Sequence, residues 1–227
     1  KIINIKKSYN TFKIDTELKT DISSFFTNIC IDLSNSRTIY LTRHGESQYN
    51  CLKKIGGNSS LSSRGIKYAT NLFTYFNNIN IDRIYTSTLN RTIETIHLFN
   101  EQKYEIHSKK YLDEINAGIC DGMTYKEIID TSPNIYKERR ADKLNFRYPY
   151  GESYKDIIER IGPFILQLER TNDNILIVAH TAVIRTLLAY FNKIDLKKMP
   201  YVDVPLHQLI ILQTNSNGSY DCKKISL

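Results

Sequence analysis

The chain has 227 residues, of which 41% are hydrophobic and 24% charged, so we expect one globular domain of ordinary size with its own core. The formal net charge of +7 points to an anionic partner, but lysines and arginines occur in ones and twos, which argues against a nucleic-acid-binding arm. The four cysteines are scattered without a CxxC pair, and no apolar run approaches the roughly 20 residues that span a bilayer. We therefore expect neither a zinc site nor a disulfide framework, and we do not expect a membrane protein. A cytoplasmic location is expected instead.

Strand-like and helix-like segments alternate along the chain. Residues 1–36 show one helical pattern, over residues 18–33. Runs rich in β-branched and aromatic residues predict strands over residues 37–42, 83–87, 174–179, 206–212 and 222–227. Apolar residues at helical spacing predict helices over residues 61–76, 93–98, 125–132, 153–168 and 183–191. This alternation predicts an α/β fold, a three-layer α/β/α sandwich around a mostly parallel central sheet.

Two of the predicted strands run into a histidine. The stretch "IYLTRHG" reaches His44, and "ILIVAHT" reaches His180 in the same way. Ligands of open α/β sheets bind at the carboxyl ends of the strands, so the two histidines are expected to face one another across a crevice. The alternative for each histidine is a hydrogen bond that only stabilises a turn.

Two arginines extend this candidate site. Arg43 precedes His44, and Arg91 follows the predicted strand at 83–87. Arg91 stands early in a helix, where the helix dipole disfavours a cation, so it needs another reason to be there. Two guanidinium groups and two histidines suit a phosphoryl group, which a histidine with a free ring nitrogen can attack. An ion pair between Arg91 and Glu94 is the simpler alternative.

Phosphoryl transfer to a histidine also needs a proton donor for the leaving oxygen. Glu114 is the first candidate, with Asp113 and Glu46 as rivals. A carboxyl group among arginines is normally ionised, because nearby positive charge lowers its pKa. Glu114 can act as an acid only if it is partly buried or close to the charge of a bound phosphate.

The motifs resemble a known family. "TRHGESQYN" is similar to the signature of the histidine phosphatase (phosphoglycerate mutase-like) superfamily. "KKIGGNSSLSSRG", "LDEINAGICDGMTYKEI" and "FRYPYGESYKDIIERI" further resemble the bisphosphatase domain of the bifunctional 6-phosphofructo-2-kinase/fructose-2,6-bisphosphatase family. The resemblance runs from about Arg37 to the C-terminus. It implies that residues 1–36 are an N-terminal connector at the end of a kinase half outside this chain, and that residues 37–227 are the phosphatase domain.

The resemblance implies an activity and a set of roles. The activity is hydrolysis of the 2-phosphate of fructose 2,6-bisphosphate through a phosphohistidine, which regulates glycolysis and gluconeogenesis. His44 would be the nucleophile, Glu114 the proton donor, and Arg43, Arg91, His180 and Asn50 would hold the transferring phosphate. Further substrate-binding positions are Gly56, Tyr125, Arg139, Lys143, Tyr154, Thr181 and Arg185. No metal or other cofactor is implied, except ATP for a kinase half, and the full-length protein would be a homodimer.

Two features of the sequence bear on how the substrate would be bound. Arg139 and Lys143 are spaced i and i+4, so both would point the same way in a helix and could hold a second phosphate. A solvated basic helix face is the alternative. Thr181 stands where vertebrate bisphosphatases carry a glutamine that touches the substrate, so one contact is expected to be lost or bridged by water.

Other functions are left open at this stage. A phosphoglycerate mutase or a broad sugar phosphatase of the same superfamily would use the same histidines, and a mutase should turn over 3-phosphoglycerate. A non-catalytic phospholigand-sensing domain of a larger kinase would keep the arginines but lose His44 or Glu114, and both are present.

Overall fold

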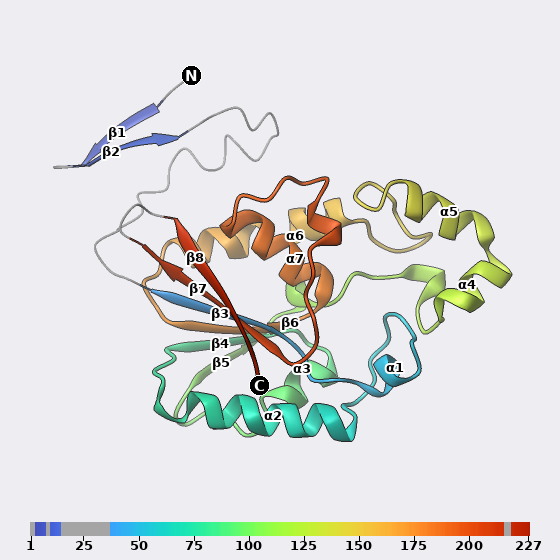
Figure 1. The fold of residues 1–227 in the computed structure, drawn as a ribbon, viewed down its shortest axis with the longest axis horizontal. Coiled ribbons are helices and arrows are strands. Elements are labelled where there is room, and N and C mark those ends of the chain that lie inside the picture. Colours follow the sequence, from blue (N-terminus) through green and yellow to red (C-terminus); the bar gives the residue numbers. More distant parts are fainter. Residues whose placement is uncertain (1–2, 8–9, 15–36, 216–218) are drawn as a thin grey trace.

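The computed structural model describes residues 3–7, 10–14, 37–215 and 219–227. A six-stranded sheet in the order β5-β4-β6-β3-β7-β8 forms its centre (Figure 1). The strands are β3 (Thr38–Arg43), β4 (Arg83–Thr86), β5 (Glu105–Ser108), β6 (Ile175–Ala179), β7 (Gln208–Thr214) and β8 (Tyr220–Ser226). Neighbours from β5 to β3 pair in parallel, and β7 pairs antiparallel with both β3 and β8. The predicted mostly parallel central sheet is confirmed.

Helices cover both faces of this sheet. The helices α2 (Ser63–Tyr75) and α3 (Asn90–Thr95) lie on one side of the sheet in Figure 1, and α6 (Tyr154–Glu169) and α7 (Thr181–Phe191) lie on the other. The strand residues alternate accordingly. Ile39 and Leu41 pack in the core under α6 and α7, whereas Tyr40 packs in the core under α2. The three-layer α/β/α architecture is therefore also confirmed.

The central strands β3 and β6 explain why this fold is stable. All five residues of β6 are buried, as the continuous apolar run "ILIVA" predicts for a strand covered on both faces. Each fully buried Ile or Leu contributes about 1.5–3 kcal/mol relative to exposure. In the parallel register Arg43 pairs with Ala179, so the residues that follow them, His44 and His180, leave the sheet side by side.

A smaller helical lobe lies beyond the carboxyl ends of the parallel strands. It contains α4 (Tyr125–Thr131) and α5 (Pro133–Ala141), and the short α1 (Gln48–Cys51) lies nearby (Figure 1). The lobe has its own apolar cluster of buried residues, Ala117, Cys120, Ile128 and Tyr148. The 3₁₀ helices are η2 (Phe76–Asn78), η3 (Lys110–Leu112), η4 (Gly118–Cys120) and η5 (Met199–Tyr201).

Several predicted elements need correction. The helix predicted through Leu98 ends at Thr95, and the helix predicted from residue 183 begins at Thr181. Ile66 was expected on the apolar face of α2, but 53% of it is exposed. The edge strand β5 was not predicted, because none of its four residues is fully buried and they lack a clear apolar pattern.

The N-terminal segment is described only in part. It contains an antiparallel pair, β1 (Ile3–Lys7) and β2 (Asn10–Ile14). The helix predicted over residues 18–33 lies outside the described residues, and the boundary between a connector and the phosphatase domain after residue 36 stays a prediction.

Candidate active site

His44 occupies the end of β3 in a form suited to nucleophilic attack. Its backbone N–H donates to the carbonyl oxygen of Ala179 at 3.1 Å, which prolongs the β3–β6 ladder past the strand. Its Nδ1 lies 2.7 Å from the carbonyl oxygen of Gly45, a partner that can only accept, so Nδ1 carries the proton of the neutral ring and Nε2 keeps its lone pair. Burial, with Arg91 adding to it, holds the pKa of His44 well below its usual range. The ring is therefore neutral near pH 7.

His180 faces His44 as expected from the paired strand ends. The two ring centroids are 5.1 Å apart, and the rings are tilted by 53°. His180 Nε2 lies 2.7 Å from Ser87 Oγ, and among the described residues its buried Nδ1 has no hydrogen-bond partner. Burial followed by the charge of Arg91 lowers the pKa of His180 well below its usual range. Nδ1 of His180 is thus available for a hydrogen bond to a ligand.

Arg43 and Arg91 bring two cations to the same place, Arg91 buried and Arg43 partly buried. Arg43 Nη1 donates to the Val204 carbonyl oxygen at 2.8 Å, and its buried Nε has no partner in the described part of the chain. Arg91 is 3% exposed, and its Nη1 donates to the carbonyl oxygen of Gly57 at 2.7 Å. Burial lowers the pKa of both guanidinium groups, yet arginine stays charged at neutral pH. Buried positive charge of this kind favours an anionic ligand.

The alternative reading of Arg91, an ion pair with Glu94, is wrong. Glu94 Oε2 instead accepts the backbone N–H of Leu61 at 2.7 Å. Glu94 thereby ties the loop before α2 to α3, and Arg91 is left to face the site.

Glu114 reaches the start of α7, the helix that His180 caps. Its Oε2 accepts the N–H of Thr181 at 3.1 Å, and its Oε1 accepts the N–H of Ala182 at 3.1 Å and of Ile115 at 2.9 Å. The first amides of a helix have no partner within the helix, so a carboxylate satisfies them well. These bonds place the Glu114 carboxylate at the two residues that follow His180, where its charge also acts on Arg43 and Arg91.

The two rival carboxyl groups have other partners. Asp113 accepts hydrogen bonds from the backbone N–H and the hydroxyl of Thr88, at 2.8 and 2.9 Å. Glu46 accepts from Ser62 Oγ at 2.8 Å and pairs with Arg64 at 3.2 Å. The Ser62 hydrogen bond is the main reason why the pKa of Glu46 is lowered, so Glu46 is an ionised group rather than a proton donor.

A glycine loop closes another side of the site. Gly56 has φ +67°, and a Cβ at this position would lie 1.7 Å from Asp121 Oδ1. Asp121 in turn accepts the N–H of Gly57 at 3.0 Å, next to the carbonyl that Arg91 binds. Glycine is required here for both the backbone conformation and the space. Asn50 uses its side-chain oxygen to accept the N–H of Ser47 at 2.9 Å, so only its amide nitrogen can serve a ligand.

A second group of cations lies near the first. Lys143 Nζ donates to the Pro200 carbonyl oxygen at 2.8 Å, and burial together with the charges of Arg185 and Arg139 lowers its pKa to about 8. Arg185 Nη1 donates to the Tyr154 hydroxyl at 3.0 Å. Arg139 lies over the ring of Tyr125, 5.3 Å from its centroid. The predicted substrate-binding side chains are thus partly assembled around this positive cluster.

Arg139 and Lys143 both contribute to the cluster, but the prediction that they share one helical face is wrong. The helix α5 ends at Ala141, so the two residues do not share an i, i+4 helical face. Asp142 ends the helix because its side chain accepts the N–H of Asn145 and turns the chain. Lys143 therefore approaches Arg139 through a turn and not along a helix.

His207 is a residue of the site region that the sequence analysis missed. Its Nε2 accepts the N–H of Glu46 at 3.1 Å, and its ring stacks on Tyr68 with centroids 4.8 Å apart. One signal could have found it. His207 immediately precedes β7, and because β7 runs antiparallel to β3, the start of β7 lies at the same sheet edge as the end of β3.

Neither a metal centre nor a membrane span is found in the described part of the chain. No group of three or more His, Cys, Asp or Glu side chains there is arranged to hold a metal ion. Over the same residues no helix combines the length and the apolar character needed to cross a membrane.

Comparisons with known proteins agree with this geometry. Residues 39–225 match the family described as "Histidine phosphatase superfamily (branch 1)". The chain is 42% identical to the Saccharomyces cerevisiae protein named fructose-2,6-bisphosphatase, with 96% of this chain and 48% of that protein covered. It is 39% identical to 6-phosphofructo-2-kinase/fructose-2,6-bisphosphatase 3 of Rattus norvegicus, with 100% and 40% covered. The chain therefore spans less than half the length of these two relatives.

A solved structure shares the fold. The α-ribazole phosphatase of Shigella flexneri superposes with a TM-score of 0.75 at 24% identity, covering 84% of this chain and 96% of that one. The predicted phosphoglycerate mutase-like architecture, which the resemblance implied, is confirmed at the level of the fold.

Proposed function

The chain belongs to the histidine phosphatase superfamily, and from this premise we propose that it hydrolyses the 2-phosphate of fructose 2,6-bisphosphate to give fructose 6-phosphate and phosphate. One observation carries the chemistry, namely the buried pair of neutral histidines, His44 and His180, with the guanidinium groups of Arg43 and Arg91 beside it. The substrate is supported by the second cationic cluster and by relatives that are named for fructose 2,6-bisphosphate.

The first step transfers the phosphoryl group to His44. The lone pair of Nε2 forms the N–P bond while the bond from phosphorus to the sugar oxygen breaks. Glu114 gives its proton to that oxygen, so the sugar leaves as an alcohol. Arg43 and Arg91 stabilise the charge on the transferring group, which is where preorganised cations contribute most.

The second step returns the enzyme to its starting state. Water attacks phosphorus, the N–P bond breaks, and the electron pair returns to His44 Nε2. Glu114, now ionised, takes one proton from the water and is again ready to act as an acid. Its hydrogen bonds to the amides of Thr181 and Ala182 hold the carboxylate in place between the two steps.

The second cluster supplies binding energy away from the reacting bond. Lys143, Arg139 and Arg185 would hold the 6-phosphate, and Tyr154 fixes the Arg185 fork through its hydroxyl. Tyr125, stacked under Arg139, and Thr181 at the start of α7 would contact the sugar. Binding energy from a remote phosphate orients the reacting end, so its loss should lower the rate as well as the affinity.

The proposal extends to the full-length protein. Some of its relatives, among them the Rattus norvegicus protein, carry kinase names and are more than twice as long as this chain, which supports a covalently linked kinase half that would bind ATP. A homodimer and a cytoplasmic location belong to the same proposal. The phosphatase domain itself would use neither a metal nor another cofactor.

Phosphate release from fructose 2,6-bisphosphate tests this function directly. We expect turnover by the wild-type chain and a loss of at least about 10³-fold in His44→Ala, because the nucleophile is removed. His97→Ala is the matched control, since His97 is exposed on the surface. 3-Phosphoglycerate and fructose 1,6-bisphosphate serve as competing substrates. Preferred turnover of 3-phosphoglycerate would identify a mutase, equal turnover of all three would identify a broad phosphatase, and tight binding without turnover would identify a sensor.

A further inference from the structure

Arg160 holds the segment that carries Glu114, although it was not among the predicted site residues. We propose that Arg160, together with Glu152, is a positioning device that sets the Glu114 carboxyl group against the leaving oxygen. The inference rests on the proposed phosphatase chemistry and adds two residues to it.

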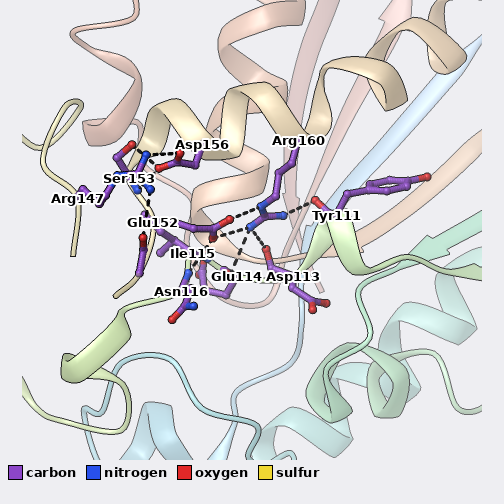
Figure 2. Close-up of polar contacts among 11 residues, drawn as sticks. Tyr111, Asp113, Glu114, Ile115, Asn116, Arg147, Glu152, Ser153, Asp156 and Arg160 are labelled. Atoms are coloured by element: carbon purple, nitrogen blue, oxygen red, sulfur yellow. Dashed lines mark hydrogen bonds and ion pairs between the residues drawn. The ribbon is translucent and has the colours of Figure 1, made fainter. Parts of the chain in front are cut away.

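Figure 2 shows Arg160 reaching from α6 to the backbone of the segment around Glu114. Its Nη1 donates to the carbonyl oxygen of Tyr111, and its Nη2 donates to that of Asp113 at 2.7 Å and, more weakly, to that of Glu114 at 3.4 Å. One guanidinium group thus binds three carbonyl oxygens within four consecutive residues. These hydrogen bonds involve a charged donor, which makes them stronger than bonds between neutral groups.

Glu152 binds the same segment on the other side of Glu114. Its Oε1 accepts Arg160 Nε at 2.9 Å, and its Oε2 accepts Arg160 Nη2 at 3.3 Å (Figure 2). The same Oε2 accepts the backbone N–H of Asn116 at 2.9 Å, and the Glu152 N–H donates to the Asn116 carbonyl oxygen at 2.9 Å. The segment is therefore held from Tyr111 to Asn116, with Glu114 between the two anchors.

The ion pair between Arg160 and Glu152 is partly buried, which favours a fixed geometry. The side chains of Arg160 and Glu152 are 21% and 23% exposed, and the contact has the two-pronged form that arginine makes with a carboxylate. Exposed single-pronged pairs contribute little, because water and side-chain entropy compete with them. This pair also satisfies backbone groups of the 111–116 segment, so its loss would free the segment itself.

The backbone amides of α7 cannot by themselves position the Glu114 carboxyl group for proton transfer. They bind the Glu114 carboxylate oxygens, but the proposed acid role requires a proton on that group and contact with the leaving oxygen. During this step at least one of those amide bonds must weaken, whereas the bonds of Arg160 to the backbone carbonyls remain. A proton donor must come within about 2.6–3.2 Å of its target, and a 1 Å displacement can cost about 10²-fold in rate.

Arg160→Gln tests the inference in single turnovers with enzyme in excess, because the leaving group departs in the phosphorylation step. We expect a loss of about 10²-fold with fructose 2,6-bisphosphate and a change of no more than a few-fold in its Kd, since the cations that bind phosphate are untouched. With p-nitrophenyl phosphate the rate should change only a few-fold, because nitrophenolate leaves without a proton. A purely structural defect would slow both substrates alike.

Two further variants guard against misfolding and charge effects. Glu152→Gln keeps the shape of the second anchor but removes its charge, so it should show the same substrate selectivity with a smaller loss. Arg147→Gln is the matched control. Arg147 pairs with Asp156 and donates to the Gly151 carbonyl oxygen in the same region, but those partners lie outside the 111–116 segment (Figure 2).

The outcomes separate the inference from the proposed function. Equal losses on both substrates, or no loss in either Arg160→Gln or Glu152→Gln, would overturn the positioning role. If the wild-type chain hydrolyses another alkyl phosphate but not fructose 2,6-bisphosphate, the proposed substrate fails and the same comparison is made with that ester. If the wild-type chain forms no phosphohistidine, the proposed function and this inference fail together.

Discussion

Glu114 Oε2 accepts the backbone N–H of Thr181 at 3.1 Å, so the expected proton donor is fastened to the first residue of the helix that His180 caps. This bond couples the expected proton donor to His180 through the backbone. The N–H groups at the start of a helix are suited to bind a carboxylate, because they have no partner within the helix.

Replacement of Glu114 should show whether this residue, and not another carboxyl group, is the proton donor. Glu114→Gln should lower kcat for a sugar phosphate by about 10²–10⁴-fold, the usual contribution of a general acid. Asp113→Asn should cost much less, because Asp113 is bound to Thr88 and not to α7. Steady-state kinetics of both variants makes the comparison, and a larger loss in Asp113→Asn would transfer the acid role to Asp113.

His44 should remain neutral well below pH 6.5, the ordinary midpoint of a histidine. Its pKa is lowered in the folded protein, so the uncharged nucleophile is present at neutral pH and is lost only as the pH falls through that lower pKa. An NMR titration of the ring resonances checks this, with His44→Asn used to assign the signal. A titration midpoint at or above 6.5 would contradict the buried, neutral histidine.

Lys143 should make substrate binding sensitive to alkaline pH. Its pKa is lowered to about 8, so its positive charge is present below pH 8 and is lost as the pH rises through that value. A hydrogen bond to a charged group contributes about 1.5–3 kcal/mol, and the charged fraction of Lys143 falls about tenfold between pH 7 and pH 9, so KM should rise by up to about tenfold. The measurement is KM against pH for the wild type and for Lys143→Arg.

The arginine variant provides the contrast because its side chain stays charged over the whole range. KM of Lys143→Arg should therefore be nearly independent of pH. If both proteins weaken equally between pH 7 and pH 9, another group is responsible.

Two glycines should respond to alanine in opposite directions. Gly56→Ala should lower both stability and activity, since it places a Cβ 1.7 Å from Asp121 Oδ1 on a backbone with φ +67°. Strain at such positions costs about 1–3 kcal/mol. Gly162 lies in α6 with no atom within 4 Å of an added Cβ, so Gly162→Ala should stabilise the protein by up to about 1 kcal/mol. Urea unfolding measures both changes, and unaltered stability of Gly56→Ala would contradict the crowded loop.

The central sheet and the first half of the site follow from local sequence. Runs rich in β-branched and aromatic residues marked β3, β4 and β6, and the fully apolar run of β6 is typical of a strand covered on both faces. Parallel strands end at one edge, so His44 and His180 could be placed together before any contact was known. The motifs around them then resembled one superfamily, and the family match agrees.

The relations between remote segments were decided by the tertiary structure. The half-exposed edge strand β5 carries no clear pattern, and the end of α5 at Ala141 invalidated the helical pairing of Arg139 with Lys143. His207 stacking on Tyr68 likewise depends on where two distant segments meet.

The partners of Arg160 are the least predictable from the sequence. Nothing in the residues around Arg160 indicates that it binds carbonyl groups of the 111–116 segment. Periodicity reports which face of an element is buried, because burial acts on each side chain through its own apolar area. Hydrogen bonds to a particular carbonyl or amide require two segments to be fixed within about 3 Å of one another. Only packing of the whole chain fixes that distance, so local sequence predicts where His44 stands in the fold, and the packing of α6 against the 111–116 segment sets what holds Glu114, the expected proton donor.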